Sequence, residues 1–231
     1  MNSSAVPVIA VDGPGGAGKG TVCRRLARQL GWHYLDSGML YRLLAMATIN
    51  HHIEVDNESA IKVMASALDV SFERRGEGDD YRAVLEGEDV SDGLRSEEIG
   101  MIASQVASLP SVRAALLARQ RAFAELPGLV ADGRDMGTVV FPEAAVKIFL
   151  TATVEERAKR RHKQLLEQGQ NDSLARLVEA IAARDKADMT RPVAPLVPAS
   201  DSLQIDSTPL SVDQVCELIL ERAREVGLID R

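Results

Sequence analysis

One short stretch of the chain is dense in glycine. The run "GPGGAGKG", residues 13–20, follows the apolar run "VPVIAVD" and opens the helix-like run "GTVCRRLARQLG". A Gly-x-x-x-x-Gly-Lys pattern between a strand and a helix is typical of a P-loop, whose backbone N–H groups cradle phosphate oxygens where no side chain intervenes. Lys19 adds a cation toward the terminal phosphates. The alternative is a glycine-rich turn with a chance lysine, and the strand–loop–helix context disfavours it.

The position after the lysine departs from the usual pattern. A Ser or Thr there binds magnesium through its hydroxyl, whereas this chain has Gly20 and only then Thr21. We therefore expect no direct protein ligand to the ion. Nucleotide phosphates and water would hold it, because magnesium dehydrates reluctantly. Thr21 and Asp132, the latter at the end of an expected strand, would act through water.

Arginines near the ends of expected strands indicate a second anionic site. Each guanidinium offers a planar, bidentate fork that suits phosphate. In open α/β sheets such sites gather outside the carboxyl ends of the strands, so we expect this one to face the P-loop. The arginines are Arg42, Arg113, Arg134, Arg184 and Arg191. A solvated charged face or a surface ion pair is the alternative, and it is the better interpretation of Arg184–Asp188 taken alone.

Three segments carry most of these arginines. "LDSGMLYR" (35–42) offers Ser37 near a helix start, and "ADGRDMGTVV" (131–140) places Asp132, Arg134 and Asp135 close together. "ARDKADMTRP" (183–192) spaces Arg184, Asp188 and Arg191 at i, i+4 and i+7, which predicts that all three lie on one helix face. A guanine-reading Asn-Lys-x-Asp and an apolar strand ending in Asp-Glu are missing, which argues against a GTPase and a motor ATPase.

Composition limits the other possibilities. The chain has 231 residues, a net charge of −7 and 45% hydrophobic residues, so we expect an ordinary globular protein without bulk nucleic-acid binding. Its two cysteines form no disulfide framework or metal site, and its four histidines show no metal-ligand spacing. A basic signal-peptide region and an apolar run of about 20 residues are both lacking, so we expect no membrane partner and a cytoplasmic location.

Apolar runs alternate with helix-like runs along the chain. We expect strands at 6–12, 32–37, 128–135, 145–152 and 202–208. We expect helices at 20–31, 38–51, 111–126, 153–169, 173–188 and 211–227, the last opened by a Ser-x-x-Gln capping box. This order predicts an α/β fold with a parallel sheet covered on both faces. The polar, glycine-punctuated segment 69–93 instead predicts a small antiparallel hairpin module inserted into the core.

Over nearly its whole length the sequence resembles the cytidylate kinases, in their longer bacterial form. The resemblance rests on "DGPGGAGKGT", "LDSGMLYR", "LEGEDVS", "IASQVASLPSVRAALLARQR", "ADGRDMGTVVFP" and "RPVAPLVPA". It implies a P-loop fold with a five-stranded parallel sheet, and phosphoryl transfer from ATP to CMP or dCMP with magnesium (Mg2+). It also implies a kinase core at 1–64 and 102–231, a lid at about 155–190 and an inserted acceptor-binding module at 65–101.

The resemblance implies roles for individual residues. The ATP phosphates would be held by Gly13, Pro14, Gly15, Gly16, Ala17, Gly18, Lys19, Gly20 and Thr21. The basic helix 155–164 would act as a lid, with Arg157, Arg160 and Arg161 available to the donor phosphates; a solvated basic face is the alternative for any one of them. The acceptor phosphate would be clamped by Arg42, Arg134 and Arg191, with Tyr41 also at the acceptor. Ser37, Arg113 and Asp135 would read cytosine, and Ser104, Arg184 and Asp188 would face the sugar.

Hydrogen-bond chemistry is consistent with the cytosine assignment that the resemblance implies. Cytosine presents an amino donor at N4 and acceptors at N3 and O2, which suit the Asp135 carboxylate and the Arg113 guanidinium respectively. Two alternatives stay open: a kinase for another small acceptor such as UMP, and a nucleotide-binding regulatory module without turnover. We expect nucleotides as the partners and a monomeric enzyme.

Overall fold

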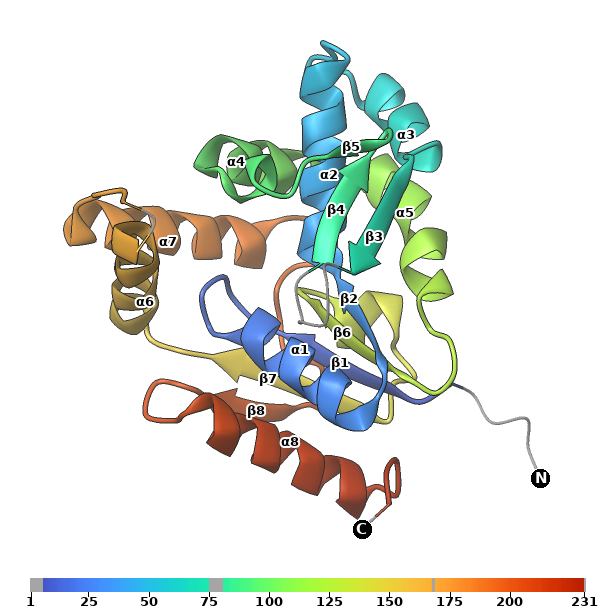
Figure 1. Ribbon diagram of the computed structural model, residues 1–231, viewed down its shortest axis with the longest axis vertical. Coiled ribbons are helices and arrows are strands. Elements are labelled where there is room, and N and C mark those ends of the chain that lie inside the picture. Colours follow the sequence, from blue (N-terminus) through green and yellow to red (C-terminus); the bar gives the residue numbers. More distant parts are fainter. Residues whose placement is uncertain (1–5, 75–80, 168, 231) are drawn as a thin grey trace. The chain divides into compact units, whose positions relative to one another are not determined.

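The computed structural model describes residues 6–74, 81–167 and 169–230 (Figure 1). The chain forms two compact units. Unit 1 comprises Met1–Leu35 and Phe123–Arg231, and unit 2 comprises Asp36–Ala122. Each unit has a hydrophobic cluster of its own.

A five-stranded sheet with the strand order β2-β6-β1-β7-β8 organises unit 1. Its strands are β1 (Val8–Asp12), β2 (His33–Asp36), β6 (Leu129–Gly133), β7 (Val146–Thr151) and β8 (Leu203–Asp206). The central strand β1 pairs in parallel with β6 and β7, and β8 pairs in parallel with β7. Every residue of β1 and β6 is buried, as expected of strands in a parallel sheet covered on both faces. The predicted α/β fold is confirmed.

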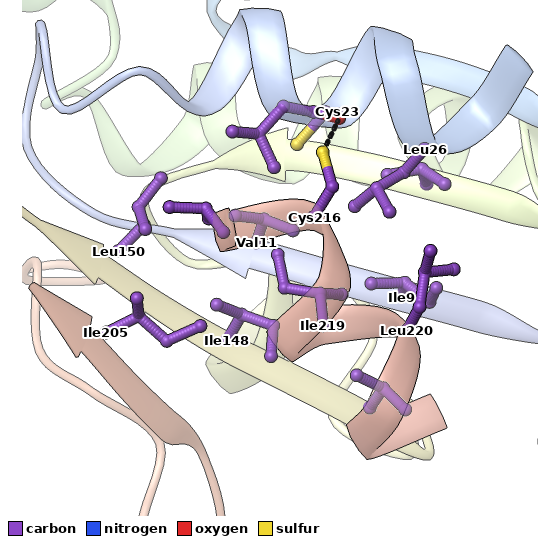
Figure 2. Packing of buried hydrophobic residues seen from close by; sticks show 14 of the residues in the cluster. Ile9, Val11, Cys23, Leu26, Ile148, Leu150, Ile205, Cys216, Ile219 and Leu220 are labelled. Atoms are coloured by element: carbon purple, nitrogen blue, oxygen red, sulfur yellow. Dashed lines mark hydrogen bonds between the residues drawn. The ribbon is translucent and has the colours of Figure 1, made fainter. Parts of the chain in front are cut away.

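Helices α1 (Lys19–Leu30) and α8 (Val212–Glu225) pack against this sheet. Helix α6 (Val154–Glu167) packs against α7 (Leu174–Thr190). Side chains of α1 and α8 pack with β1, β7 and β8 in one aliphatic cluster, which Figure 2 shows from close by. Cys23 of α1 and Cys216 of α8 are buried there and are not joined by a disulfide. The predicted capping box of α8 is present, with Ser211 and Gln214 exchanging side-chain and backbone hydrogen bonds.

Unit 2 is mostly helical, with α2 (Ser37–Asn50), α3 (Glu58–Ser66), α4 (Glu97–Val106) and α5 (Pro110–Ala122). A short antiparallel sheet joins β3 (Val70–Arg74), β4 (Tyr81–Leu85) and β5 (Glu88–Asp89). This confirms the antiparallel hairpin predicted within 69–93, of which residues 75–80 lie outside the described part of the chain. Unit 2 extends beyond the predicted module at 65–101 on both sides, and the acceptor-binding role of that module stays a prediction.

Within residues 6–74, 81–167 and 169–230, no single helix is long and apolar enough to cross a bilayer. One pair bent by 97°, Glu98–Val106 with Pro110–Ala122, has the length and composition for it when the two helices are taken together.

Candidate active site

The glycine-rich loop connects β1 to α1 by a backbone path that only glycine fits. Gly13 has φ +147°, and a Cβ added there would lie 2.0 Å from the carbonyl oxygen of Leu150 on β7. Gly18, the N-cap of α1, has φ +96°. Both values lie in a region that side chains other than glycine rarely adopt. The P-loop therefore keeps its N–H groups and the N-terminus of α1 clear for an anion.

Lys19 holds its charge inside this loop. Its Nζ donates to the carbonyl oxygens of Gly13 at 2.8 Å and Pro14 at 2.9 Å, and lies 3.8 Å from Oδ1 of Asp132. The residue is only 5% exposed. Burial and the nearby Arg134 guanidinium lower the pKa of Lys19 to about 8, with Asp132 opposing them. The ammonium is thus mostly protonated at neutral pH and lies within the phosphate-binding loop.

The other side of the loop is braced by side chains from α6 and from the end of β8. Nη1 of Arg157 donates to the carbonyl of Gly15 at 3.1 Å. Nη1 of Arg160 and the hydroxyl of Ser207 both donate to the carbonyl of Ala17, at 3.4 and 2.9 Å. The loop carbonyls therefore have their own donors. Ser207 could not be predicted, because nothing in the local sequence marks a serine after a strand as a partner of this loop.

Arg157 makes a second set of contacts that sequence reasoning also missed. Its guanidinium forms a two-pronged ion pair with Asp185 of α7, in which Nη1 donates to Oδ1 at 2.9 Å and Nη2 donates to Oδ2. Arg157 is 3% exposed, whereas Arg161, one turn further along α6, is half-buried. Their predicted contacts with ATP phosphates stay predictions. In this structure Arg157 supports the backbone of the loop.

The segment after β6 brings two predicted acceptor residues next to the P-loop. Nε of Arg134 donates to Oδ2 of Asp188 at 2.9 Å, and its Nη2 would lie 3.3 Å from a Cβ at Gly15. Asp135 is 2% exposed and is the N-cap of the π-helix η2 (Met136–Val140). Arg134 therefore lies beside Gly15 of the P-loop, and Asp132 lies beside Lys19.

Asp12, which sequence reasoning did not single out, joins β1 to this segment. Its Oδ1 accepts from the backbone N–H of Met136 at 2.7 Å, and its Oδ2 accepts from Gly137 at 2.8 Å. Burial raises the pKa of Asp12 to about 6, the two N–H groups and Lys19 lower it, and Asp135 adds to the rise. A carboxylate directly before the first P-loop glycine, at the buried end of an apolar strand, is the sequence signal that could have found it.

The third predicted segment is only partly helical. Arg184 and Asp188 lie on α7, which ends at Thr190, whereas Arg191 is the C-cap with φ −62° and ψ 141°. The prediction that all three share one helix face is therefore wrong for Arg191. The reason is Pro192, because the residue before a proline is disfavoured in the α region. Nε of Arg191 donates instead to the carbonyl of Ala194 at 2.6 Å.

The remaining predicted acceptor residues belong to unit 2. Ser37, at the start of α2, is buried and accepts from Nε2 of Gln120 at 2.7 Å. Arg113 of α5 is buried, stacks over the ring of Tyr41 at 5.7 Å from its centroid, and donates to the carbonyl of Ala107 at 3.0 Å. These contacts fix the orientation of two side chains predicted to read a base.

Arg42 and Ser104 complete the set in unit 2. Nη1 of Arg42 donates to the carbonyls of Leu94 at 2.6 Å and Ser96 at 3.2 Å. A Cβ at Gly100 of α4 would lie 3.0 Å from Nη2 of Arg42, so this glycine leaves room for the guanidinium. Ser104 is half-buried one turn further along α4.

The part of the chain that the structure describes contains no group of three or more His, Cys, Asp or Glu side chains arranged to hold a metal ion. Near the P-loop, Asp132 is buried and Thr21 is exposed on the first turn of α1.

Comparison with known proteins decides which P-loop protein this is. The family profile described as cytidylate kinase matches residues 9–225. The chain belongs to the cytidylate kinase family. A curated cytidylate kinase of Pseudomonas savastanoi pv. phaseolicola is 61% identical over 222 residues, which cover 96% of this chain and 97% of that protein. That of Pseudomonas paraeruginosa is 55% identical over 225 residues, covering 97% and 98%.

Among solved structures, a shikimate kinase from Bacteroides thetaiotaomicron aligns over 96% of this chain and 99% of its own, at 16% identity and a TM-score of 0.43. As a member of the cytidylate kinase family, the chain is a nucleoside monophosphate kinase, a phosphotransferase. The matched range 9–225 begins within β1 and ends with α8, and it includes every site residue described above.

Proposed function

We propose that this chain moves the γ-phosphoryl group of ATP to CMP or dCMP with the help of magnesium, giving ADP and CDP or dCDP. The observation that carries the proposal is the buried ammonium of Lys19 inside a glycine-lined loop at the N-terminus of α1, in a chain of the cytidylate kinase family. Anionic phosphates are the ligands that such a loop binds.

The reaction needs no general base. Its nucleophile is an oxygen of the acceptor phosphate, which is largely ionised at neutral pH. Catalysis then consists of holding two anionic groups in line and neutralising the charge of the phosphoryl group in transit. Lys19 and the loop N–H groups supply this at the donor. Arg42, Arg134 and Arg191 are proposed to supply it at the acceptor phosphate.

Base recognition is proposed for Ser37, Arg113 and Asp135. The Asp135 carboxylate would accept from the N4 amino group of cytosine, and Arg113 would donate to N3 or O2. In support, Asp135 and Arg113 are both buried, and Tyr41 packs under the Arg113 guanidinium. A buried polar group rejects a ligand that leaves it unpaired, which favours cytosine over uracil.

Sugar recognition is proposed for Ser104, Arg184 and Asp188. Arg184 is exposed on α7, and Asp188 is buried one turn later with its carboxylate on Arg134. Hydroxyl groups of a ribose are suitable donors for that carboxylate and acceptors for that guanidinium.

Magnesium fits the donor side of this arrangement. The Asp132 carboxylate next to Lys19 and the hydroxyl of Thr21 are oxygen groups of the kind that the ion prefers. They would orient its water molecules, and the ion would neutralise charge on the ATP phosphates. We further propose that the enzyme acts as a cytoplasmic monomer on free nucleotides in pyrimidine nucleotide metabolism; its net charge of −7 disfavours nucleic acid as a partner.

A coupled ADP-release assay over a panel of nucleoside monophosphates tests the proposal. ATP consumption should depend strictly on the added acceptor, with kcat/KM highest for CMP and dCMP. Equal use of UMP would replace the proposed acceptor specificity by that of a broader pyrimidine kinase. Nucleotide binding without turnover on any acceptor would instead indicate a regulatory module.

A further inference from the structure

Asp12 lies outside the proposed set of substrate contacts, yet it holds the backbone that carries two of them. It is the last residue of the central strand β1, is 4% exposed, and directly precedes Gly13 of the P-loop. Its two carboxylate oxygens accept separate backbone hydrogen bonds from Met136 and Gly137, which are 124 and 125 residues further along the chain.

The segment between these anchors contains Arg134 and Asp135. On its N-terminal side the sheet fixes Gly133, which is the register partner of Asp12. On its C-terminal side the Asp12 carboxylate fixes the amides of Met136 and Gly137. Two residues are thus held between two attachment points to the same residue of β1. The side chain of Asp135 makes no capping bond to η2, so the carboxylate of Asp12 takes that place.

A buried carboxylate is a costly way to satisfy two amides. Burial disfavours its charge, and only a charged carboxylate offers both oxygens as acceptors with no proton of its own to place. Hydrogen bonds to an ionised acceptor are shorter and stronger than those to a neutral one. Such an arrangement makes physical sense where a backbone segment must be held to a few tenths of an ångström, as substrate-reading side chains require.

We infer that Asp12 is a positioning residue for acceptor recognition: by bonding Met136 and Gly137 it fixes where Arg134 and Asp135 present their side chains. The inference rests on the proposed function, because Arg134 and Asp135 are there given the acceptor phosphate and the base. Loss of the Asp12 carboxylate should weaken acceptor binding and base discrimination more than it weakens ATP binding.

Graded variants test this. Asp12→Asn keeps one acceptor oxygen and turns an NH2 group toward the other amide, and Asp12→Ala keeps neither oxygen. We expect KM for CMP to rise about tenfold or more in Asp12→Asn and further in Asp12→Ala. The CMP-to-UMP ratio of kcat/KM should fall at least several-fold. Calorimetric affinity for a non-hydrolysable ATP analogue should change less than about threefold.

Ile9→Val is the matched control. It removes a methylene from a fully buried side chain of the same strand, away from residues 134–137, so it weakens packing without touching the two amides. It should leave the CMP-to-UMP ratio at the wild-type value. An unchanged ratio in both Asp12 variants, or an equal loss of CMP and ATP-analogue affinity, would overturn the inference.

Hydrogen exchange gives a readout that needs neither turnover nor a folded variant. In the wild-type protein the amides of Met136 and Gly137 should exchange at least 100-fold more slowly than unstructured amides, and Asp12→Asn should lose this protection at one or both. Rapid exchange at both in the wild type would overturn the inference even if no Asp12 variant folds. If the wild-type protein does not phosphorylate CMP, the proposed function is refuted. The exchange experiment would still test whether Asp12 holds the amides of Met136 and Gly137.

Discussion

Arg157 and Asp185 form a buried ion pair that joins α6 to α7, and the same guanidinium donates to the carbonyl of Gly15 in the P-loop. Two helices and the phosphate loop therefore share one charged group. Removing one partner of a buried ion pair is costly, because the other charge stays buried without a partner. The stability of a variant that lacks the Arg157 guanidinium therefore tests whether this residue supports the fold around the P-loop.

Arg157→Ala should lower the free energy of unfolding by about 3–5 kcal/mol, because it leaves the Asp185 carboxylate buried without its partner. The double variant Arg157→Met, Asp185→Leu should recover much of this loss. Chemical denaturation measures both. Arg161→Ala is the control, since Arg161 is only half-buried on the same helix. Equal stability of Arg157→Ala and Arg161→Ala would contradict a structural role for Arg157.

Lys19→Ala should lower kcat by about 10²–10³-fold, because it removes a preorganised positive charge from the transferring phosphoryl group. Lys19→Arg should recover little, since the pocket between the carbonyls of Gly13 and Pro14 fits an ammonium. Steady-state kinetics with CMP gives the values, and circular dichroism shows whether the variants fold. A folded Lys19→Ala enzyme with wild-type kcat would exclude the P-loop lysine from the mechanism.

Asp12 should make stability depend on pH in a direction opposite to that of a paired surface carboxylate. Its pKa is about 6 in the fold and 3.8 in the unfolded chain, so its protonated form contributes stability below pH 3.8 that is lost as pH rises through 6. Relative to Asp12→Asn, the wild type should lose about 2 kcal/mol between pH 4 and pH 7. Urea titrations at several pH values measure this difference, and parallel curves for the two proteins would disprove it.

Asp135→Asn should lose CMP activity while its CMP-to-UMP ratio of kcat/KM falls. The amide can turn a donor toward the O4 carbonyl of uracil, whereas the carboxylate sets acceptor against acceptor. Sites that pair a buried polar group discriminate by up to about 10⁴-fold. Arg113 should still oppose the protonated N3 of uracil, so the switch should be incomplete. If kcat/KM for both substrates falls by the same factor, Asp135 supports the site without reading the base.

Arg184→Ala and Asp188→Ala should differ in their effects on sugar recognition. Arg184 is exposed, so its loss should change the CMP-to-dCMP ratio with little change in stability. Asp188 also accepts from Arg134, so its loss should raise KM for both substrates as well. Kinetics on CMP and dCMP for each variant separates these patterns. Wild-type ratios in both would exclude Arg184 and Asp188 from sugar recognition.

Local patterns predicted the elements better than the contacts between them. The apolar runs and the glycine-rich loop were sufficient to predict the sheet, α1 and the position of Lys19. Strand burial and P-loop geometry depend on residues that are neighbours in the sequence. The i, i+7 spacing wrongly placed Arg191 on the helix face of Arg184 and Asp188, although Pro192 carries the signal that ends the helix.

Side-chain contacts between residues that are distant in the sequence could not be predicted from local patterns. The basic helix predicts a contact of Arg157 with the donor phosphates and does not predict its ion pair with Asp185, which lies 28 residues away on another helix. The hydrogen bonds of Asp12 cannot be predicted for the same reason, because its two donors are 124 and 125 residues away in the sequence. Asp12 ends an apolar run, so its charge predicts that a partner exists without saying which, whereas Arg157 stands among other charged residues of α6 and carries no such signal.

Gly13 belongs to the packing of the sheet as much as to the phosphate loop. Any side chain there would enter the space of the Leu150 carbonyl, and β7 could yield only by leaving its pairing with β1, where Val11 lies opposite Ile148 and Asp12 opposite Phe149. A substitution at Gly13 would therefore disturb folding and lower the yield of protein. An assay of the folded protein that is recovered would then underestimate or miss its effect on nucleotide binding. Inactive variants at Gly13 consequently say little about how ATP is held.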